Sequence, residues 1–545
     1  MILLTTLLLS LFITMTLIPI FKNYAVWLHA VDVPNGRSMH THPKPKIGGL
    51  AMAAGVLLPV LLWVPSGRFI QSLLLGSAVI VLFGFIDDRR NLSYKSKFAG
   101  QILASLIVIL YGGLKIKFLG TLLPHGTLIA NYFSIPLTLV VIVGVTNAMN
   151  LSDGLDGLAG GISLLCFICI GLLAYQAGNL LIAVFSVAVI GAIFAFLRFN
   201  THPAVVFMGD AGSLLLGFLA ITLSLSLTQG NNPISPLFPL FLFGIPVLDT
   251  FVVMLQRLIK GRSPFVADKN HLHHKLINLG LFHSEAVFTI YILQAFLVTA
   301  AFLFRFYSEW FLILFYLVFA TGILSWLSFT TRAGWRFNRH DILGGIFRGK
   351  LTILRERTIF IKVSYWTVLM GLPSMLLFTC LLPLTIPTPF HIMSFCLACL
   401  ILLIMLFKAQ WMEITLRLAM YFLVPLLVYQ SHIQMVSWMS FDFVRIYNVS
   451  FLFLVFFVIW MLKLTRRQNG FKTTPTDFLI LFIALIVPNL PDAQIQSYQM
   501  GLFAAKIIAM LFSYEVLVGE LRGELHGFGL TIISALLVVG VRGLV

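Results

Sequence analysis

The chain has 545 residues, of which 59% are hydrophobic and only 10% are charged. Soluble domains carry about 25% charged residues, so this composition excludes an ordinary soluble protein. The formal net charge is +17, but the basic residues lie in short loops between apolar runs, which is typical of the positive-inside rule and not of nucleic-acid binding. We therefore expect an all-α polytopic membrane protein with no nucleic-acid partner.

Apolar runs long enough to span a bilayer recur along the whole chain. The first run, residues 1–20, has no basic segment before it and no small-residue cleavage site after it, which predicts a spanning helix and not a removed signal. Across the first 330 residues the apolar runs predict about eleven transmembrane helices, at 2–21, 48–65, 70–86, 98–114, 130–147, 158–176, 179–197, 213–229, 236–258, 285–304 and 309–328.

A basic segment separates these helices from a second hydrophobic region. Arginines and lysines are frequent between Arg332 and Lys362. About seven further spanning runs follow, at 365–386, 391–408, 411–430, 449–463, 477–490, 500–518 and 527–543. The predicted organisation is a membrane-embedded domain at 1–330, a basic cytoplasmic linker at 331–364, and a transmembrane extension at 365–545 whose role the sequence does not indicate.

The polar motifs all fall on one predicted face of the membrane. They follow predicted helices 1, 3, 5, 7 and 9, and their loops also hold most of the basic residues, such as Lys44, Arg89 and Lys275. Because positive loops mark the cytoplasmic side, we predict that this face is cytoplasmic and that the amino terminus lies outside. The basic segment follows predicted helix 11 and falls on the same face.

An acidic pair ends the third predicted helix. Asp87 and Asp88 are followed directly by Arg89 and Arg90. One interpretation is a solvated helix end with local ion pairs. The other is a general base or metal-adjacent pair, because neighbouring acids in a confined site push their pKa values apart and one of them could hold a proton.

Four polar residues recur every three positions after the fifth predicted helix. They are Asn147, Asn150, Asp153 and Asp156, and at this spacing consecutive members are neighbours on a helix. Two glycines among them weaken the helix and let the backbone approach a ligand. Amides can read a nucleobase or ribose, and carboxylates can bind hydroxyls or a metal; the alternative is a broken loop with capping side chains.

Asp210 stands just before the next apolar run. It could cap that helix, since Asp is favoured there. It could also be a Mg²⁺ ligand, because Mg²⁺ is usually held by one or two carboxylates together with substrate phosphates.

Two basic loops complete the set of candidates. His271, His273 and His274 lie in one of them; a zinc site is disfavoured because cysteine is lacking, whereas a solvated loop or a loop that holds a diphosphate remains open. The first loop carries Lys44 and Lys46 among prolines, and these could contact phosphate or be positive-inside residues only.

These motifs, in this order, resemble the polyprenyl-phosphate N-acetylhexosamine-1-phosphate transferases, glycosyltransferase family 4. The match is closest to the undecaprenyl-phosphate N-acetylglucosamine-1-phosphate transferase branch. The matching segments are Pro-Lys-Ile-Gly-Gly (45–49), Phe-Ile-Asp-Asp (85–88), Asn-Ala-Met-Asn-Leu-Ser-Asp-Gly-Leu-Asp-Gly (147–157), Phe-Met-Gly-Asp-Ala-Gly-Ser (207–213), Pro-Val-Leu-Asp-Thr (246–250) and the histidine segment 263–274.

The resemblance implies a reaction at the membrane surface. A phosphate oxygen of undecaprenyl phosphate attacks the β-phosphate of a UDP-N-acetylhexosamine, and UMP leaves. The branch implies transfer of N-acetylglucosamine 1-phosphate, which starts a lipid-linked surface polysaccharide. It also implies Mg²⁺ as the cofactor, with Mn²⁺ as an alternative, and a multi-pass location in the bacterial inner membrane.

The resemblance also implies roles for individual residues. Asp210 is a metal ligand, with Asn150 and Asp153 beside it. Asp87 and Asp88 deprotonate or orient the lipid phosphate, and the histidines act on the diphosphate. The expected catalytic and substrate-binding residues are Asp87, Asp88, His271, His273 and His274, and Asn147, Asn150, Asp153, Asp156, Lys44, Lys46 and Lys97.

Two departures from the family pattern matter. Leu272 interrupts the histidine run, which is uninterrupted in the muramyl-pentapeptide branch, and this argues against that peptidoglycan role. The family usually ends near residue 330, so the family pattern leaves the extension at 365–545 unexplained; a homodimer or polysaccharide-assembly partners are the interactions considered for it. A transporter or flippase of lipid-linked sugars is the alternative, although transporters place their ionisable groups near the midplane.

Overall fold

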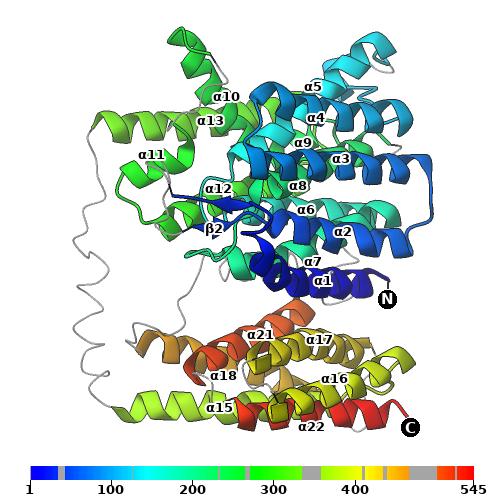
Figure 1. Cartoon of the computed structure of the whole chain (residues 1–545), viewed down its shortest axis with the longest axis vertical. Helices are drawn as coiled ribbons and strands as arrows, with labels where there is room; N and C mark the ends of the chain where they lie inside the picture. Colours follow the sequence, from blue (N-terminus) through cyan, green and yellow to red (C-terminus); the bar gives the residue numbers. More distant parts are fainter. Residues whose placement is uncertain are drawn as a thin grey trace. The chain divides into compact units, whose positions relative to one another are not determined.

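The computed structural model describes ten stretches of the chain. They are residues 2–34, 43–124, 127–230, 233–263, 270–333, 358–407, 411–433, 439–464, 500–521 and 525–544. The chain forms two compact units (Figure 1), an N-terminal unit of Met1–Asn338 with Thr474–Thr476, and a C-terminal unit of Arg339–Thr473 with Asp477–Val545. Each unit is described by itself below.

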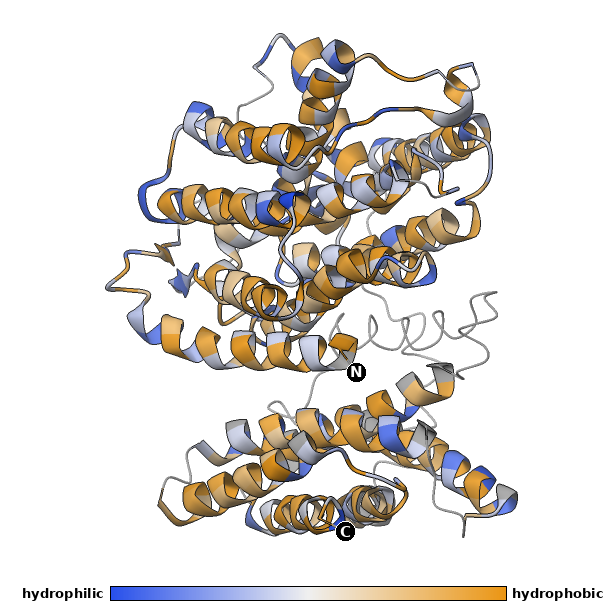
Figure 2. Cartoon of the chain, turned by 90° about the vertical axis from the view of Figure 1, so that its right-hand side faces the viewer, coloured by the Kyte–Doolittle hydropathy of each residue, from blue (hydrophilic) through white to orange (hydrophobic). Residues whose placement is uncertain are grey.

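The expected all-α polytopic class is confirmed. Ten helices of the described stretches are long and apolar enough to cross a membrane, and Figure 2 shows hydrophobic residues along most of their length. Within the same stretches the strands amount to one short antiparallel pair, β1 (Val31–Asp32) and β2 (Lys44–Pro45). The protein is therefore a multi-pass membrane protein.

The helices of the N-terminal unit follow the predicted runs closely. A single π-helical turn at Ile107–Tyr111 continues α4. The helices are α1 (Ile2–Tyr24), α2 (Gly48–Trp63), α3 (Arg68–Arg90), α4 (Tyr94–Leu106), α5 (Asn131–Leu151), α6 (Leu158–Gln176), α7 (Leu180–Asn200), α8 (Gly209–Thr228), α9 (Phe238–Leu242), α10 (Gly244–Ile259), α11 (Leu272–Asn278), α12 (His283–Leu303) and α13 (Glu309–Arg332).

The prediction of one helix at 236–258 is wrong, because α9 and α10 are separate. The break at Phe243 is stabilised by a side chain from α12: Gln294 donates from Nε2 to the Leu242 carbonyl (2.7 Å) and accepts from the Ile245 amide (3.4 Å). Pro246 adds to the break, since it lacks the amide that would continue the helix. At 16 residues, α10 is shorter than the roughly 20 residues that span a bilayer.

Helix α8 is the buried centre of the N-terminal unit, and α2, α3, α5 and α6 pack around it (Figure 1). Glycines allow the closest approaches. A Cβ on Gly84 of α3 would lie 2.5 Å from the Ala211 Cα, and one on Gly49 of α2 would lie 2.2 Å from the Gly212 amide nitrogen. These contacts bring the end of α3 against the start of α8.

The C-terminal unit is a second helical bundle with its own apolar core, to which Leu423, Met510 and Ile532 belong. Arg417 pairs there with Glu515 (3.0 Å) and with Glu413 (2.7 Å). The predicted helix at 477–490 and most of the predicted linker lie outside the described residues. The described helices are α15 (Thr358–Leu381), α16 (Thr388–Phe407), α17 (Met412–Ile433), α18 (Phe441–Leu464), α21 (Met500–Leu521) and α22 (His526–Arg542).

Glu309, at the start of α13, binds two loops of the N-terminal unit. Its carboxylate accepts hydrogen bonds from the Thr121 amide (2.7 Å), the Thr121 hydroxyl (2.5 Å) and the Ser235 hydroxyl (2.9 Å). The Glu309 and Ser235 side chains are buried, so the Ser235 hydroxyl depends on the carboxylate as its acceptor.

We expect Glu309→Gln to lower the free energy of unfolding by about 1–3 kcal/mol, because one amide NH₂ would face a buried donor. Thermal unfolding of the purified protein in detergent measures the change. Glu285→Gln is the matched control, since Glu285 is exposed and makes one hydrogen bond, to the Phe282 amide. Equal unfolding temperatures for the two variants would contradict this prediction.

Candidate functional site

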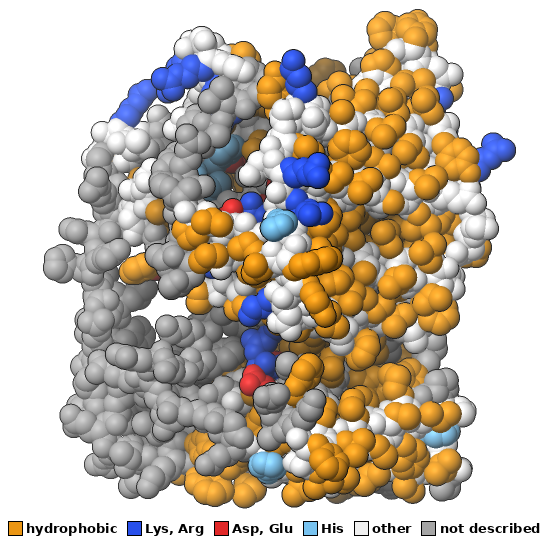
Figure 3. Space-filling view, in the orientation of Figure 1, with side chains coloured by type: hydrophobic (Ala, Val, Ile, Leu, Met, Phe, Trp, Pro, Cys, Tyr) orange, Lys and Arg blue, Asp and Glu red, His pale blue; other side chains and the backbone are white. Residues whose placement is uncertain are grey.

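A cleft of about 360 Å³ opens in the N-terminal unit. In Figure 3 acidic and histidine side chains gather in a recess of this unit. The described lining includes nine of the predicted site residues: Lys44, Lys46, Asp88, Asn150, Asp153, Asp156, Asp210, His273 and His274. Asp87 and Lys97 lie behind Asp210 and contact it, whereas Asn147 and His271 are not among the lining residues.

Asp88 caps the start of α8 from the end of α3. Its Oδ1 accepts from the Asp210 amide (2.9 Å) and its Oδ2 from the Ala211 amide (3.1 Å). The first amides of a helix lack acceptors within the helix, and the buried carboxylate of Asp88 provides these acceptors. Gly209 permits the approach, because its φ is +71° and a Cβ there would lie 2.5 Å from Asp88 Oδ2. Asp88, not Asp210, is thus the capping residue.

Lys97, in the first turn of α4, lies between two carboxylates. Its Nζ is 2.9 Å from Asp210 Oδ2 and also contacts Asp87 Oδ2. Asp87 Oδ1 accepts from the Leu92 amide (2.6 Å), which fixes the acid to the link between α3 and α4. Burial lowers the pKa of Lys97, but Asp210 and Asp87 outweigh it and raise the pKa above its ordinary value, so the lysine is charged.

The predicted polar stripe is helical only in its first half. α5 ends at Leu151, so Asp153 and Asp156 lie in the turn that follows. Gly157 holds this turn with φ +83°; its amide donates to Asn200 Oδ1 (2.9 Å) and its carbonyl accepts from the Tyr291 hydroxyl (2.6 Å).

The two polar groups nearest the start of α8 in this segment are Asn150 and Asp153. Asn150 Oδ1 accepts from the Ser213 hydroxyl at 3.1 Å. Burial, and then the charges of Asp210 and Asp156, raise the pKa of Asp153 to about 7. The Asp153 carboxyl therefore gains or loses its proton near neutral pH.

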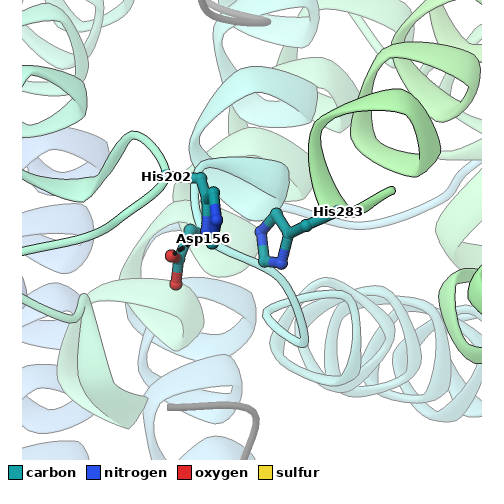
Figure 4. Close-up of side chains that lie close together, drawn as sticks. All are labelled: Asp156, His202 and His283. Carbon is teal, nitrogen blue, oxygen red and sulfur yellow. Dashed lines mark hydrogen bonds and ion pairs between the residues drawn. The ribbon is translucent and has the colours of Figure 1, made fainter. Parts of the chain in front are cut away.

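Asp156 forms a cluster with two histidines (Figure 4). Its Oδ2 lies 2.9 Å from His202 Nδ1 and accepts from the Ala204 amide at 3.0 Å, and the His202 ring stacks on His283 with centroids 4.1 Å apart. One ligand atom from each of the three residues lies within 4.8 Å of the others, a grouping that could hold a cation. Burial raises the pKa of Asp156, but the bonds to His202 and Ala204 outweigh it and the pKa is lowered.

Sequence reasoning missed His202 and His283. Neither belongs to a spaced motif, and they come from separate elements, the loop before α8 and the start of α12. Only the fold brings them to Asp156, so no signal in the sequence could have found them.

The histidine segment is held by Asp249 of α10. Asp249 Oδ2 lies 2.8 Å from His271 Nδ1, and Oδ1 accepts from the Leu272 amide (2.7 Å) at the start of α11. Asp249 stands in one of the matched motifs, but its role was not predicted. Burial, and then His274, lower the pKa of His273 to about 3. His273 is therefore neutral, although the segment was predicted as a basic loop.

The described part of the first loop supplies two lysines. Lys46 pairs with Asp32 (2.9 Å) beside the β1–β2 pair. Lys44 Nζ lies 3.9 Å from Asp156 Oδ2 and 5.0 Å from the centre of the Phe207 ring. Both lysines line the cleft, and both already face a carboxylate.

Comparison with known proteins identifies the family. Residues 70–228 match the model of "Glycosyl transferase family 4". A Bacillus subtilis protein described as a probable undecaprenyl-phosphate N-acetylglucosaminyl 1-phosphate transferase is 37% identical over 289 residues, which cover 52% of this chain and 80% of that protein.

Two further relatives agree. The undecaprenyl-phosphate alpha-N-acetylglucosaminyl 1-phosphate transferase of Escherichia coli K12 is 35% identical over 57% of this chain and 88% of its own length. The decaprenyl-phosphate N-acetylglucosaminephosphotransferase of Mycobacterium leprae is 38% identical over 49% of this chain and 74% of its own length. The resemblance drawn from the motifs is therefore confirmed: the chain belongs to glycosyl transferase family 4 and is a sugar-phosphate transferase.

Proposed function

We propose that this protein transfers N-acetylglucosamine 1-phosphate from UDP-N-acetylglucosamine to undecaprenyl phosphate and releases UMP, as the first step of a lipid-linked surface polysaccharide. The observation that carries the proposal is one cleft in which Asp88, Asp153, Asp156, Asp210 and the histidine segment meet. The names of the three relatives support the donor and the lipid acceptor. None of the three is described as a transporter, and no observation favours the flippase alternative.

The cofactor in this proposal is Mg²⁺, with Mn²⁺ as an alternative, held by Asp210, Asn150 and Asp153. These residues fit such an ion because each offers oxygen, the donor that Mg²⁺ prefers, and because all three line the cleft. A divalent ion bound there would neutralise charge on the donor diphosphate. The Asp156 cluster offers imidazole nitrogen and is a poorer match to Mg²⁺.

The two adjacent acids have different roles in this proposal. Both oxygens of Asp88 accept amide hydrogens of α8, so Asp88 positions Asp210 in this proposal. One oxygen of Asp87 accepts a hydrogen bond from the Leu92 amide, and the other contacts the Lys97 ammonium. When Lys97 turns away, that second oxygen is open to orient or deprotonate the lipid phosphate, the role expected of the pair.

The remaining cleft residues serve the nucleotide sugar. We assign the nucleoside to the Asp156 side of the cleft, next to Phe207 and Lys44. Asn147, on α5, is not among the lining residues, and its expected role in substrate binding stays a prediction. The diphosphate is assigned to Lys46, Lys97 and the segment of His271, His273 and His274. Neutral His273 can donate one hydrogen bond there, whereas the lysines supply the positive charge.

A lipid acceptor needs an apolar approach to the cleft, and α10 supports one. Phe251, Leu255 and Ile259 of this helix are exposed, while Asp249 on the same helix holds the histidine segment. An amphipathic helix of this kind lies in the membrane interface. The excess of basic residues in the motif loops supports the cytoplasmic face of the inner membrane. Residues 1–330 form the transferase domain in this proposal, and 365–545 an extension for a homodimer or assembly partners.

Asp210→Asn should reduce UMP release by at least about 100-fold, because it removes a charge that acts directly at the reacting phosphates. The assay combines purified protein, Mg²⁺ and undecaprenyl phosphate with a panel of UDP-N-acetylhexosamines. Asp442→Asn is the control, since Asp442 is exposed on α18. The proposal fails if the parent releases no UMP from any donor and Asp210→Asn behaves identically.

Asp249→Asn should reduce turnover by about 100-fold without unfolding the protein, because misplaced reacting groups cost about that much. The amide keeps an oxygen for Leu272 but offers N–H to His271 Nδ1, which reverses the histidine's donor and acceptor nitrogens. Turnover and the unfolding temperature are measured on the same preparation. Full activity in this variant would show that the histidine segment needs no support from α10.

A chain that ends at Ala333 should keep UMP release within a few-fold of the full protein. The candidate residues all precede α13, and the N-terminal unit is compact by itself. Specific activity and size-exclusion behaviour of the truncated chain in detergent test this. Loss of activity in a truncated chain that is still folded would assign the extension a part in the reaction.

A further inference from the structure

Among the described residues, Lys97 contacts two carboxylates of the site at once. Asp87 is buried, and Asp210 is partly buried. The Lys97 Nζ lies 2.9 Å from Asp210 Oδ2 and contacts Asp87 Oδ2, and the side chains of Asp87 and Asp210 also contact each other. Two carboxylates so close repel each other and are costly to bury without a counter-ion. The lysine therefore stabilises the pair.

The backbone that carries Lys97 is firmly fixed. The link between α3 and α4 turns at Asn91 with φ +47°, Asp87 accepts from the Leu92 amide, and Ser93 caps α4 by accepting from the Ser96 amide. The lysine side chain, in contrast, is a flexible four-carbon stem that ends in a point charge. Its ammonium can move by several ångströms while α4 stays in place.

We propose that Lys97 is a built-in counter-ion for the Asp87–Asp210 pair, which a divalent cation displaces from Asp210 so that the ammonium turns to the substrate diphosphate. The inference rests on the proposed function, since it takes Asp210 as the ligand of that cation. Its physical basis is that an ammonium and a divalent ion at one carboxylate repel each other strongly. The freed ammonium then finds its best partner in a phosphate oxygen.

Three consequences follow from this exchange. Removal of the lysine charge should tighten divalent-ion binding, because Lys97 no longer competes for Asp210 and both carboxylates lose their counter-ion. The same change should make protein stability depend more on the divalent ion. Nucleotide should tighten ion binding more where the lysine is present, because the diphosphate then also gives the displaced ammonium its new partner.

The test measures Mn²⁺ binding directly, by the paramagnetic resonance signal of free Mn²⁺, on the full chain in detergent and without donor or lipid. Lys97→Met should bind Mn²⁺ at least about tenfold more tightly than the parent, as expected from removal of one adjacent positive charge. Lys97→Arg keeps the charge and should bind like the parent. Lys95→Met is the matched control, because Lys95 lies in the same turn of α4 but is exposed.

A second measurement covers the case in which Lys97→Met is poorly folded without the ion. The rise in unfolding temperature on adding Mn²⁺ should then be larger for Lys97→Met than for the parent and for Lys95→Met. Mn²⁺ binding by Lys97→Met that is equal to or weaker than that of the parent, with no larger rise, overturns the inference. Asp210→Asn should abolish the difference between lysine and methionine at position 97, and a difference that persists would also overturn it.

The outcomes also separate this inference from the proposed function. Tighter Mn²⁺ binding by Lys97→Met in a protein that releases no UMP supports the ion exchange and rejects the transferase reaction. If the protein releases UMP but binds Mn²⁺ equally well with lysine or methionine at position 97, the transferase reaction is supported and the ion exchange is rejected. UDP-N-acetylglucosamine should tighten Mn²⁺ binding by the parent more than by Lys97→Met; equal effects in both would reject the transfer of the ammonium to the diphosphate.

Discussion

The site depends on the two hydrogen bonds by which Asp88 of α3 caps the start of α8. A buried helix start with unpaired amides is costly, so this capping fixes where α8 begins. It also sets Asp210 beside Asp87, because Asp87 precedes the capping acid in the chain. Gly84 and Gly209 leave the space for it. Of the paired acids in the sequence, Asp88 therefore fixes the start of α8, whereas Asp87 contacts Lys97 and Asp210.

The three lysines of the site already face carboxylates of the protein. Lys46 faces Asp32, Lys44 faces Asp156, and Lys97 faces Asp87 and Asp210. Neutral His273 adds no charge. In the proposed reaction, a dianionic substrate and a divalent ion would enter a site whose charged side chains must change partners, and the long lysine side chains are the groups best able to do so.

Much of the fold could be predicted from the sequence, because a spanning helix must be long and apolar. The division of α9 from α10 could not, since Gln294 of α12 supplies the bonds that permit it. Within the site, Asp87, Asp88 and Asp210 could be expected to meet on the strength of the motifs. His202, His283 and the role of Asp249 could not, because their partners are distant in the sequence.

The deep burial of α8 has a consequence for how phosphate can be bound. A helix carries partial positive charge at its amino terminus, which in many proteins binds phosphate directly. Here the amino-terminal end of α8 faces the cleft, but the first amides of this helix already donate to the carboxylate of Asp88. The macrodipole of this helix therefore stabilises a protein acid, and in the proposed reaction the attraction for the substrate phosphates comes from side chains and from the proposed cation.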